Sequence, residues 1–273
     1  MPVMLEMSET EYRAHPAVNY SVLKHAQKSA AHMKHARDTV TEPTPQMVLG
    51  TVVDCLLFSR NDFTKRFVVS PDIDRRTKEG KAAYQELLNT SVGKTIISAD
   101  VWQKADAMVS SALKSKAVLA LLADQRFQVP MLWHDADTGV ECKALCDSIR
   151  DGVTVTDCKT THNADWREFS RSCANFSYHV QAAFYTDGYF ACTKQRLPYT
   201  FIAIESAAPY PVAVYRLDNA SIEAGRRQYK YALEVWKRST ASGVWEGYPD
   251  QLQTIELPKY ALTAVGVEAD DPF

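Results

Sequence analysis

The pattern of hydrophobic and polar positions divides the chain into a helical first part and a later part that alternates strands with helices. Apolar residues recur at helical spacing up to about residue 125, and β-branched and aromatic runs bounded by turn residues begin at Phe127. In chain order, this pattern predicts helices over 20–37, 46–58, 81–89 and 99–124; strands over 127–134, 140–149 and 153–160; a helix over 164–192, broken near 172–177; strands over 200–206 and 212–217; and a helix over 220–239.

The order of these elements predicts an α/β fold with helical additions at its N-terminal side. We expect one domain over 1–262. Its parts would be a helical region to about residue 125, a sheet core over about 126–217, and a helix and strand over 218–262. Residues 263–273 form a short acidic segment, for which we expect a flexible tail.

Composition and charge narrow the class of protein. Hydrophobic residues make up 46% and charged residues 23%, as in ordinary globular proteins. The formal net charge of −2 argues against a chain coated in basic charge but allows a local basic channel. No apolar run approaches the ~18 residues of a membrane helix, and the start lacks the pattern of a secretory signal. We therefore expect a cytoplasmic protein without membrane contact.

The six cysteines give little indication of function. They include no C-x-x-C pair, so reduced, partly buried thiols are expected rather than a zinc or iron–sulfur site. A cysteine hydrolase is a weak candidate, because no Cys/His pair stands in a motif.

The predicted hairpin formed by the second and third strands carries the chemistry. Alternation along a strand places Val155, Asp157 and Lys159 on one face, so a core-facing surface ends in a carboxylate and an amine. Burying both is costly unless they pair or bind an ion. With residues 150–152 as the loop, Asp147 lies opposite Val155 and diagonal to Asp157, about 7–8 Å away between Cα atoms. A two-residue loop would instead turn Asp147 to the other face.

The spacing D-x9-D-x-K suits metal-dependent phosphodiester hydrolysis. Carboxylates are suitable ligands for Mg²⁺, which polarises a phosphate and lowers the pKa of a bound water. A lysine beside the ion can orient that water or stabilise the charge that develops. In the next helix, Gln181 and Tyr185 share a face that could turn toward the metal or a DNA phosphate. The alternatives are an exposed ion pair between Asp157 and Lys159 and a Gln/Tyr pair at a core edge.

These residues resemble the active-site motif of a known superfamily. Asp147, Asp157 and Lys159, followed by Gln181 and Tyr185, resemble the motif of the PD-(D/E)xK nucleases. More closely, the chain resembles the RecE-type exonuclease VIII group of phage and prophage recombination exonucleases. The resemblance implies a restriction-endonuclease-like core, a mixed sheet flanked by helices. Supporting segments follow the group's order at 19–24, 49–57, 75–81, 201–205 and 257–261.

The resemblance also implies a binding site for Mg²⁺, with Mn²⁺ as the alternative ion. Its ligands would be Asp54, Asp147, Asp157 and the backbone carbonyl of Cys158. The chain departs from the group at Asp54, where the group usually has a histidine, and near Leu145, where it usually has an arginine. An unpaired carboxylate in the apolar helix around Asp54 would be costly, which favours ligation of a cation. The alternative is an aspartate that faces solvent.

The group's activity is the digestion of one strand of linear double-stranded DNA from its 5′ end. It releases mononucleotides and leaves a 3′ single strand for an annealing protein, within bacterial cells that carry the phage or prophage. Members form homo-oligomeric rings that enclose DNA, so basic residues need only line a channel. Such contacts carry affinity without sequence specificity, and the alternative is a solvated face. The candidate DNA contacts are Arg75, Arg76, Lys78 and Lys81 in a predicted loop over 72–81, and Lys24 and Lys28 in the first helix.

The last four residues resemble the acidic tips of bacterial single-stranded-DNA-binding proteins. Asp270, Asp271, Pro272 and Phe273 would dock by burying the phenyl ring while the acids meet basic residues of the partner. We expect this tail to recruit the annealing protein or another protein that reads such tips. The alternative is a frayed, solubilising end.

Two further functions are compatible with the same residues. The first is an endonuclease or repair nuclease on the same scaffold, because the motif does not determine how DNA ends are handled. The second is a non-catalytic DNA-binding or assembly protein with a decayed site, which Asp54 favours.

Overall fold

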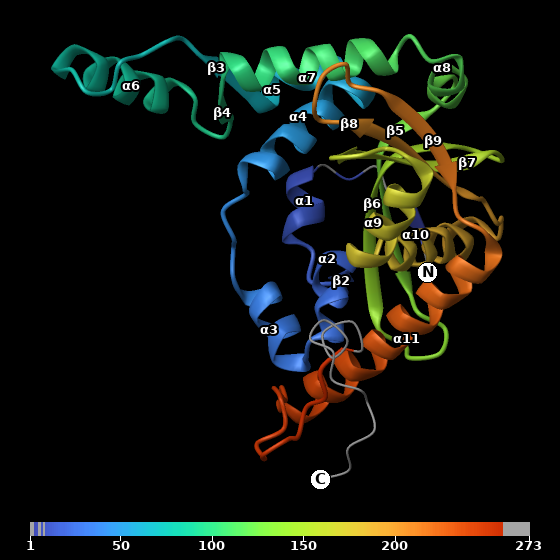
Figure 1. The fold of residues 1–273 in the computed structure, drawn as a ribbon. Coiled ribbons are helices and arrows are strands. Elements are labelled where there is room, and N and C mark those ends of the chain that lie inside the picture. The colour runs from blue at the N-terminus through green and yellow to red at the C-terminus, as the bar shows by residue number, and fades with distance from the viewer. Residues whose placement is uncertain (1–2, 5–6, 8, 259–273) are drawn as a thin grey trace, which may run out of the picture.

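The computed structural model of the protein describes residues 3–4, 7 and 9–258 (Figure 1). The predicted tail over 263–273, with Asp270, Asp271, Pro272 and Phe273, lies outside the described residues. In chain order the elements are β1 (Val3–Met4), α1 (Glu9–Ala14), β2 (Val18–Asn19), α2 (Tyr20–Leu23), the 3₁₀ helix η1 (Lys24–Gln27), α3 (Ala30–Asp38), α4 (Pro45–Phe58), the 3₁₀ helix η2 (Arg60–Asp62), α5 (Phe63–Arg66), β3 (Phe67–Ser70), α6 (Lys78–Thr90), β4 (Thr95–Ser98), α7 (Ala99–Ala112), α8 (Lys116–Leu122), β5 (Arg126–His134), β6 (Glu141–Arg150), β7 (Thr154–Thr161), α9 (Trp166–Asn175), α10 (Tyr178–Thr193), β8 (Tyr199–Glu205), β9 (Val212–Arg216) and α11 (Asn219–Ser242).

A mixed sheet forms the centre of the fold, in the strand order β1-β5-β6-β7-β8-β9, with β2 paired to β6 (Figure 1). Strand β6 is antiparallel to β5 and β7, whereas β7 is parallel to β8. The chain between β7 and β8 crosses over through α9 and α10, as a parallel pair requires. A mixed sheet flanked by helices confirms the predicted fold class.

Two hydrophobic cores cover the two faces of this sheet. The first packs α2, α10 and α11 against the sheet, and the second packs α4, α7 and α8 against its other face. Strand β8 contributes to both cores because its side chains alternate: Phe201 and Ala203 belong to the first, Ile202 and Ile204 to the second. Helices α10 and α4, which carry predicted site residues, are thus held against opposite faces beside β7.

The β6–β7 hairpin determines where the predicted acids lie. Its ladder closes at the pair Arg150 and Thr154, so the loop is residues 151–153, one residue later than predicted. This difference moves the register by two residues and leaves every side chain on its predicted face. Continued by one position, the observed register makes Asp147 face Asp157 directly instead of diagonally.

The turn at the tip of this hairpin explains the difference. The amide of Val153 donates to the carbonyl of Arg150 at 2.9 Å, and Gly152 between them has a φ of 72°. A four-residue turn with a positive φ at its third position favours glycine there. The reversal is therefore centred on Asp151 and Gly152.

The N-terminal part is less uniformly helical than predicted. The helix expected over 20–37 is divided into α2, η1 and α3, because the Ser29 side chain accepts a hydrogen bond from the His32 amide and starts a new helix. The helix expected over 99–124 is divided in the same way at Ser115. Strands β1 to β4 were not predicted, since segments of two to four residues carry too little periodicity.

The prediction of a strand after the last helix is also wrong: residues 243–258, the described part of that segment, form no strand. Gly243 ends α11 with a φ of 72°. Gly247 and two prolines, Pro249 and Pro258, interrupt the residues that follow, and proline cannot donate to a sheet ladder. No helix among the described residues is both long and apolar enough to span a bilayer.

Lys143 of β6 joins the first helix to the sheet. Its side chain is buried, and Nζ donates to the carbonyl oxygens of Tyr12 and His15 at 2.7 Å each and of Arg13 at 3.3 Å. These carbonyls lie at the C-terminal end of α1, where helical carbonyls lack backbone partners and the helix dipole favours a cation. Residues 9–15 are therefore attached to the sheet by a buried ammonium group.

Candidate active site

Asp157, Lys159 and Gln181 form one buried cluster between β7 and α10. The Lys159 ammonium nitrogen lies 2.6 Å from Asp157 Oδ2 and donates to Gln181 Oε1 at 3.1 Å. Gln181 Nε2 in turn donates to Asp157 Oδ1 at 3.0 Å. The Asp157 side chain is 4% exposed and that of Lys159 17%, which excludes the alternative of an exposed surface pair. Gln181 thus fixes the carboxylate and the ammonium relative to each other.

Asp147 enters the cluster from β6 at the point where two strands part. The last pair of the β6–β7 ladder is Ser148 with Thr156, and Asp147 and Asp157 are the next facing positions. Further along, β6 is paired with β2 instead of β7. The acids therefore lie where the sheet opens.

Asp54 approaches from α4 on the other side of β7. It lines the same cavity as Cys158 and Lys159, and its side chain is partly buried. Burial and the Asp157 carboxylate raise the pKa of Asp54 to about 7. Asp54 therefore does not face open solvent, which was the alternative to cation ligation for this residue.

The crowding of carboxylates affects the other charged groups as well. Burial, followed by the charges of Asp157 and Asp54, raises the pKa of Asp147 well above its ordinary value. Burial alone would lower the pKa of Lys159, but the carboxylates of Asp157 and Asp147 raise it above the ordinary value. One ammonium group thus faces three carboxylates, which leaves an excess of negative charge for a cation to neutralise.

The chemical type of these groups, carboxylate oxygens, suits a divalent metal ion. Among the described residues, no group of three or more His, Cys, Asp or Glu side chains is gathered closely enough to hold a metal as they stand. Asp157 Oδ2, however, is buried and lies 2.6 Å from Lys159 Nζ, and an ion pair on one side leaves the oxygen further lone pairs for a cation. Carboxylate oxygens with open lone pairs are the ligands that Mg²⁺ prefers.

The backbone of β7 offers one more oxygen. Val155 and Thr161 exchange hydrogen bonds toward the β8 side, with Pro198 and Ser206 respectively. Because backbone groups alternate between the two edges of a strand, the Cys158 carbonyl turns toward β6. The β6 ladder ends before this position, at Thr156. The carbonyl therefore points into the gap beside the acids.

A cavity of about 870 Å³ opens over these groups and is lined by α2, η1, α4, β7 and α10. Two of the predicted DNA contacts, Lys24 and Lys28, line it, as does Tyr185. Partial burial and the Lys159 ammonium lower the pKa of Lys24. Burial raises the pKa of Tyr185 well above its ordinary value. Three amines that face one cavity suit a polyanion such as a nucleic-acid strand.

The other predicted DNA contacts lie elsewhere. Arg75, Arg76, Lys78 and Lys81 belong to the loop before α6 and to α6 itself, which projects away from the sheet (Figure 1). The loop is shorter than predicted because Thr77 caps α6. The four residues of this basic arm do not line the 870 Å³ cavity.

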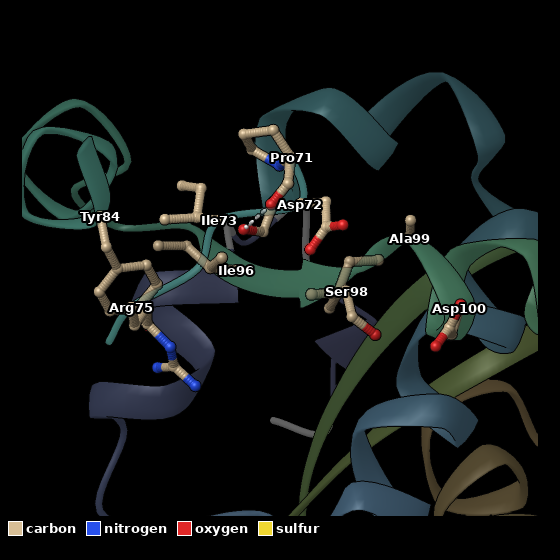
Figure 2. A pocket seen from close by; sticks show the side chains of 11 residues that line it. Pro71, Asp72, Ile73, Arg75, Tyr84, Ile96, Ser98, Ala99 and Asp100 are labelled. Carbon is tan, nitrogen blue, oxygen red and sulfur yellow. Dashed lines mark hydrogen bonds between the residues drawn. The ribbon is translucent and has the colours of Figure 1, made fainter. Parts of the chain in front are cut away.

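The contacts within the basic arm differ from residue to residue. Figure 2 shows Arg75 beside the Tyr84 ring at one end of a separate cavity of about 520 Å³. The Arg75 guanidinium lies 4.7 Å from the ring centroid. Arg76 pairs with Asp74 at 2.9 Å and 3.0 Å. The structure thus separates the predicted basic residues into a pair at the acids and a group on the arm.

Sequence reasoning missed two residues of the site. The Tyr178 ring lies 4.8 Å from Lys159 Nζ and covers it on one side. Tyr20 donates its hydroxyl hydrogen to the Ser177 carbonyl at 2.8 Å, which attaches α2 to the start of α10. Tyr178 lies one turn before Gln181, so helical spacing could have indicated it. Nothing in the sequence links Tyr20 to a residue 157 positions away.

Comparisons with known proteins agree with this architecture. Residues 19–258 match the sequence profile of a family described as a PDDEXK-like domain of unknown function (DUF3799). No curated protein matches the chain.

Solved structures provide a second comparison. A protein from Eubacterium rectale, provisionally described as an exonuclease, superimposes with a TM-score of 0.65 at 13% identity, over 96% of this chain and 99% of that one. This match supports the fold. An alkaline exonuclease from Laribacter hongkongensis matches 68% of this chain and all of that one at 14% identity, but its TM-score of 0.27 is too low to support an argument.

Proposed function

The chain belongs to the DUF3799 family of PDDEXK-like domains, and on this basis we propose that it is a divalent-metal-dependent deoxyribonuclease. One observation carries the proposal. A buried Asp157–Lys159–Gln181 cluster lies beside two further carboxylates, beneath a cavity lined by lysines. This arrangement combines oxygen ligands, a fixed ammonium group and a surface for phosphates in one place.

The proposed metal ligands are Asp54, Asp147, Asp157 and the carbonyl of Cys158. When bound, the cation, Mg²⁺ or Mn²⁺, would polarise the phosphate to be cut and lower the pKa of an attacking water. The buried carboxylate of Asp157 and the mutual crowding of the three acids support this assignment.

The other side chains orient groups and stabilise charge. Lys159, held by Gln181, presents an ammonium group where negative charge develops on the phosphate oxygens in the transition state. Gln181 bonds to both Lys159 and Asp157 and so fixes the orientation of the ion pair that they form. Lys24 and Lys28 neutralise backbone phosphates of the strand in the cavity. Tyr185 lines the cavity wall near the acids and helps to shape it.

The finer proposal is a 5′-to-3′ exonuclease that degrades one strand of linear duplex DNA to mononucleotides. This part follows the resemblance to the RecE-type group, as do the ring-shaped homo-oligomer, the origin in a phage or prophage and the supply of 3′ single strands to an annealing protein in recombination. The basic arm with Arg75, Arg76, Lys78 and Lys81 would contact the duplex outside the cavity.

An end-labelled digestion tests the activity. Linear duplexes labelled at one 5′ or one 3′ end should lose the 5′ label first, as mononucleotide, with Mg²⁺ present and not with a chelator in excess. Covalently closed circular duplex should remain intact in the same reaction. Cleavage of the circle would indicate an endonuclease, and cleavage unaffected by the chelator would contradict the metal assignment. Absence of cleavage together with retained DNA binding would favour a decayed site.

The C-terminal tail is proposed to recruit the annealing protein through Asp270, Asp271, Pro272 and Phe273. Deleting residues 269–273 should weaken the affinity for a co-encoded annealing protein, measured by titration, and leave DNA digestion unchanged. An unaltered affinity would contradict the proposal.

A further inference from the structure

The short connection between α9 and α10 presents an aromatic ring at the mouth of the site. Phe176 is 61% exposed. It lines both the 870 Å³ cavity over the acids and a neighbouring cavity of about 660 Å³. The ring therefore borders the cavity over the acids and the cavity beside it.

Phe176 is the outer member of a stack that begins at the cluster of charged residues. The Lys159 ammonium lies 4.8 Å from the Tyr178 ring, and the Tyr178 and Phe176 rings are stacked with centroids 5.6 Å apart and planes at 29°. Each layer covers the one before it. The outer layer is exposed, so the stack can accept one more flat group.

The backbone holds this ring in a fixed place. Ser177 has a φ of 58°, a conformation that residues other than glycine seldom adopt. The Tyr20 hydroxyl lies within hydrogen-bonding distance of the carbonyls of both Phe176 and Ser177, at 3.1 Å and 2.8 Å, and Gln27 Nε2 donates to the Ser177 hydroxyl at 3.0 Å. A strained residue held by two such contacts, with a third on its neighbour, indicates a position that the surrounding structure determines.

We propose that Phe176 stacks on a base of the bound DNA strand, next to the phosphate that is cut. This inference rests on the proposed function and adds a positioning residue to it. A nucleobase is flat, and its faces can stack on an aromatic ring whatever its identity. The same cavity presents the Lys24 and Lys28 amines, which suit the phosphates on either side of such a base.

A binding experiment without cleavage tests the contact. The full chain is mixed with duplex DNA that carries 2-aminopurine at the 5′ terminus, with Ca²⁺ in place of Mg²⁺. Stacking on Phe176 should change the fluorescence of the base analogue, Phe176→Ala should abolish that change, and Phe176→Trp should retain it. Trp166→Ala removes an equally exposed aromatic residue that lines neither cavity and should behave as the unaltered protein.

A cleavage experiment tests the consequence. The unaltered protein should cut a duplex with a terminal abasic nucleotide about 10- to 100-fold more slowly than one with a base, as expected for loss of one stacking contact. Phe176→Ala should cut both at the same, lower rate. An undiminished discrimination in Phe176→Ala, or an unchanged fluorescence signal, overturns the inference. If the unaltered protein cuts nothing, the proposed function fails, while the fluorescence result still decides the role of Phe176.

Discussion

Replacing Lys159 by alanine is expected to lower the rate of metal-dependent DNA cleavage by about 10²- to 10³-fold. The ammonium group faces the acids at 2.6 Å from Asp157 and is oriented by Gln181, so its removal takes a fixed positive charge from the site. The rate of release of 5′-labelled nucleotide under single-turnover conditions measures this effect directly. Gln181→Ala should cause a smaller loss, because it removes the hydrogen bonds that orient Lys159 and Asp157 but leaves the ammonium group and the carboxylate in place.

The matched control for this experiment is Lys230→Ala. Lys230 also pairs with a buried carboxylate, since its Nζ lies 2.5 Å from Asp135 Oδ2, but it belongs to α11 and does not line the cavity. The Lys230→Ala variant should be destabilised as Lys159→Ala is, but it should cleave DNA at the rate of the unaltered protein. If Lys159→Ala remains folded and cleaves as fast as the unaltered chain, the assignment of the active site is wrong.

Replacing Gly225 by alanine is expected to lower the free energy of unfolding by about 3 kcal/mol, at the upper end of the range for overpacking. Gly225 lies on α11, where a Cβ atom would stand 2.2 Å from the carbonyl oxygen of His179 on α10. The backbone of α10 cannot move aside as a flexible side chain can, so α10 and α11 would have to move apart. Urea denaturation followed by circular dichroism measures the change.

Gly247→Ala is the control for this substitution. A Cβ atom there would meet no heavy atom of the described residues within 4 Å, so the urea midpoint should hardly move. An equal midpoint for Gly225→Ala would show that α10 and α11 pack less closely than described. The result bears on the site, because α10 carries Gln181 and Tyr178.

The strands and the cluster of acids could be predicted because both depend on local patterns. Alternation along β7 requires only neighbouring residues, and it placed Asp157 and Lys159 on one face correctly. The spacing from Asp147 to Asp157 spans one hairpin, so its uncertainty was limited to the length of the turn. The positive φ of Gly152 determines the length of the turn. The hydrophobic periodicity of a sequence carries no information about a single dihedral angle, so the length could not be predicted.

What could not be predicted depends on contacts between distant segments. The Tyr20 hydroxyl and Ser177 meet only because α2 packs beside α10. The basic residues at 75–81 seemed equivalent to Lys24 and Lys28, since charge patterns carry no information on distance. Only the course of the chain through β3, α6 and β4 shows that the two groups are apart. The short strands β1 and β2 were missed because their partners, β5 and β6, hold them in place.

The attachment of Lys143 to α1 has a consequence for where the folding unit begins. The family profile starts at residue 19, yet the three carbonyls that accept hydrogen bonds from Lys143 belong to residues 12, 13 and 15. A recombinant fragment trimmed to the profile would lose all three acceptors, and with them the Tyr12 ring that lies 4.8 Å from the Lys143 ammonium. The trimming would also uncover a side chain that is only 6% exposed in the intact fold, so the sheet would lose its attachment to α1. The ten residues ahead of the recognised boundary are therefore part of the fold, and expression should start before them.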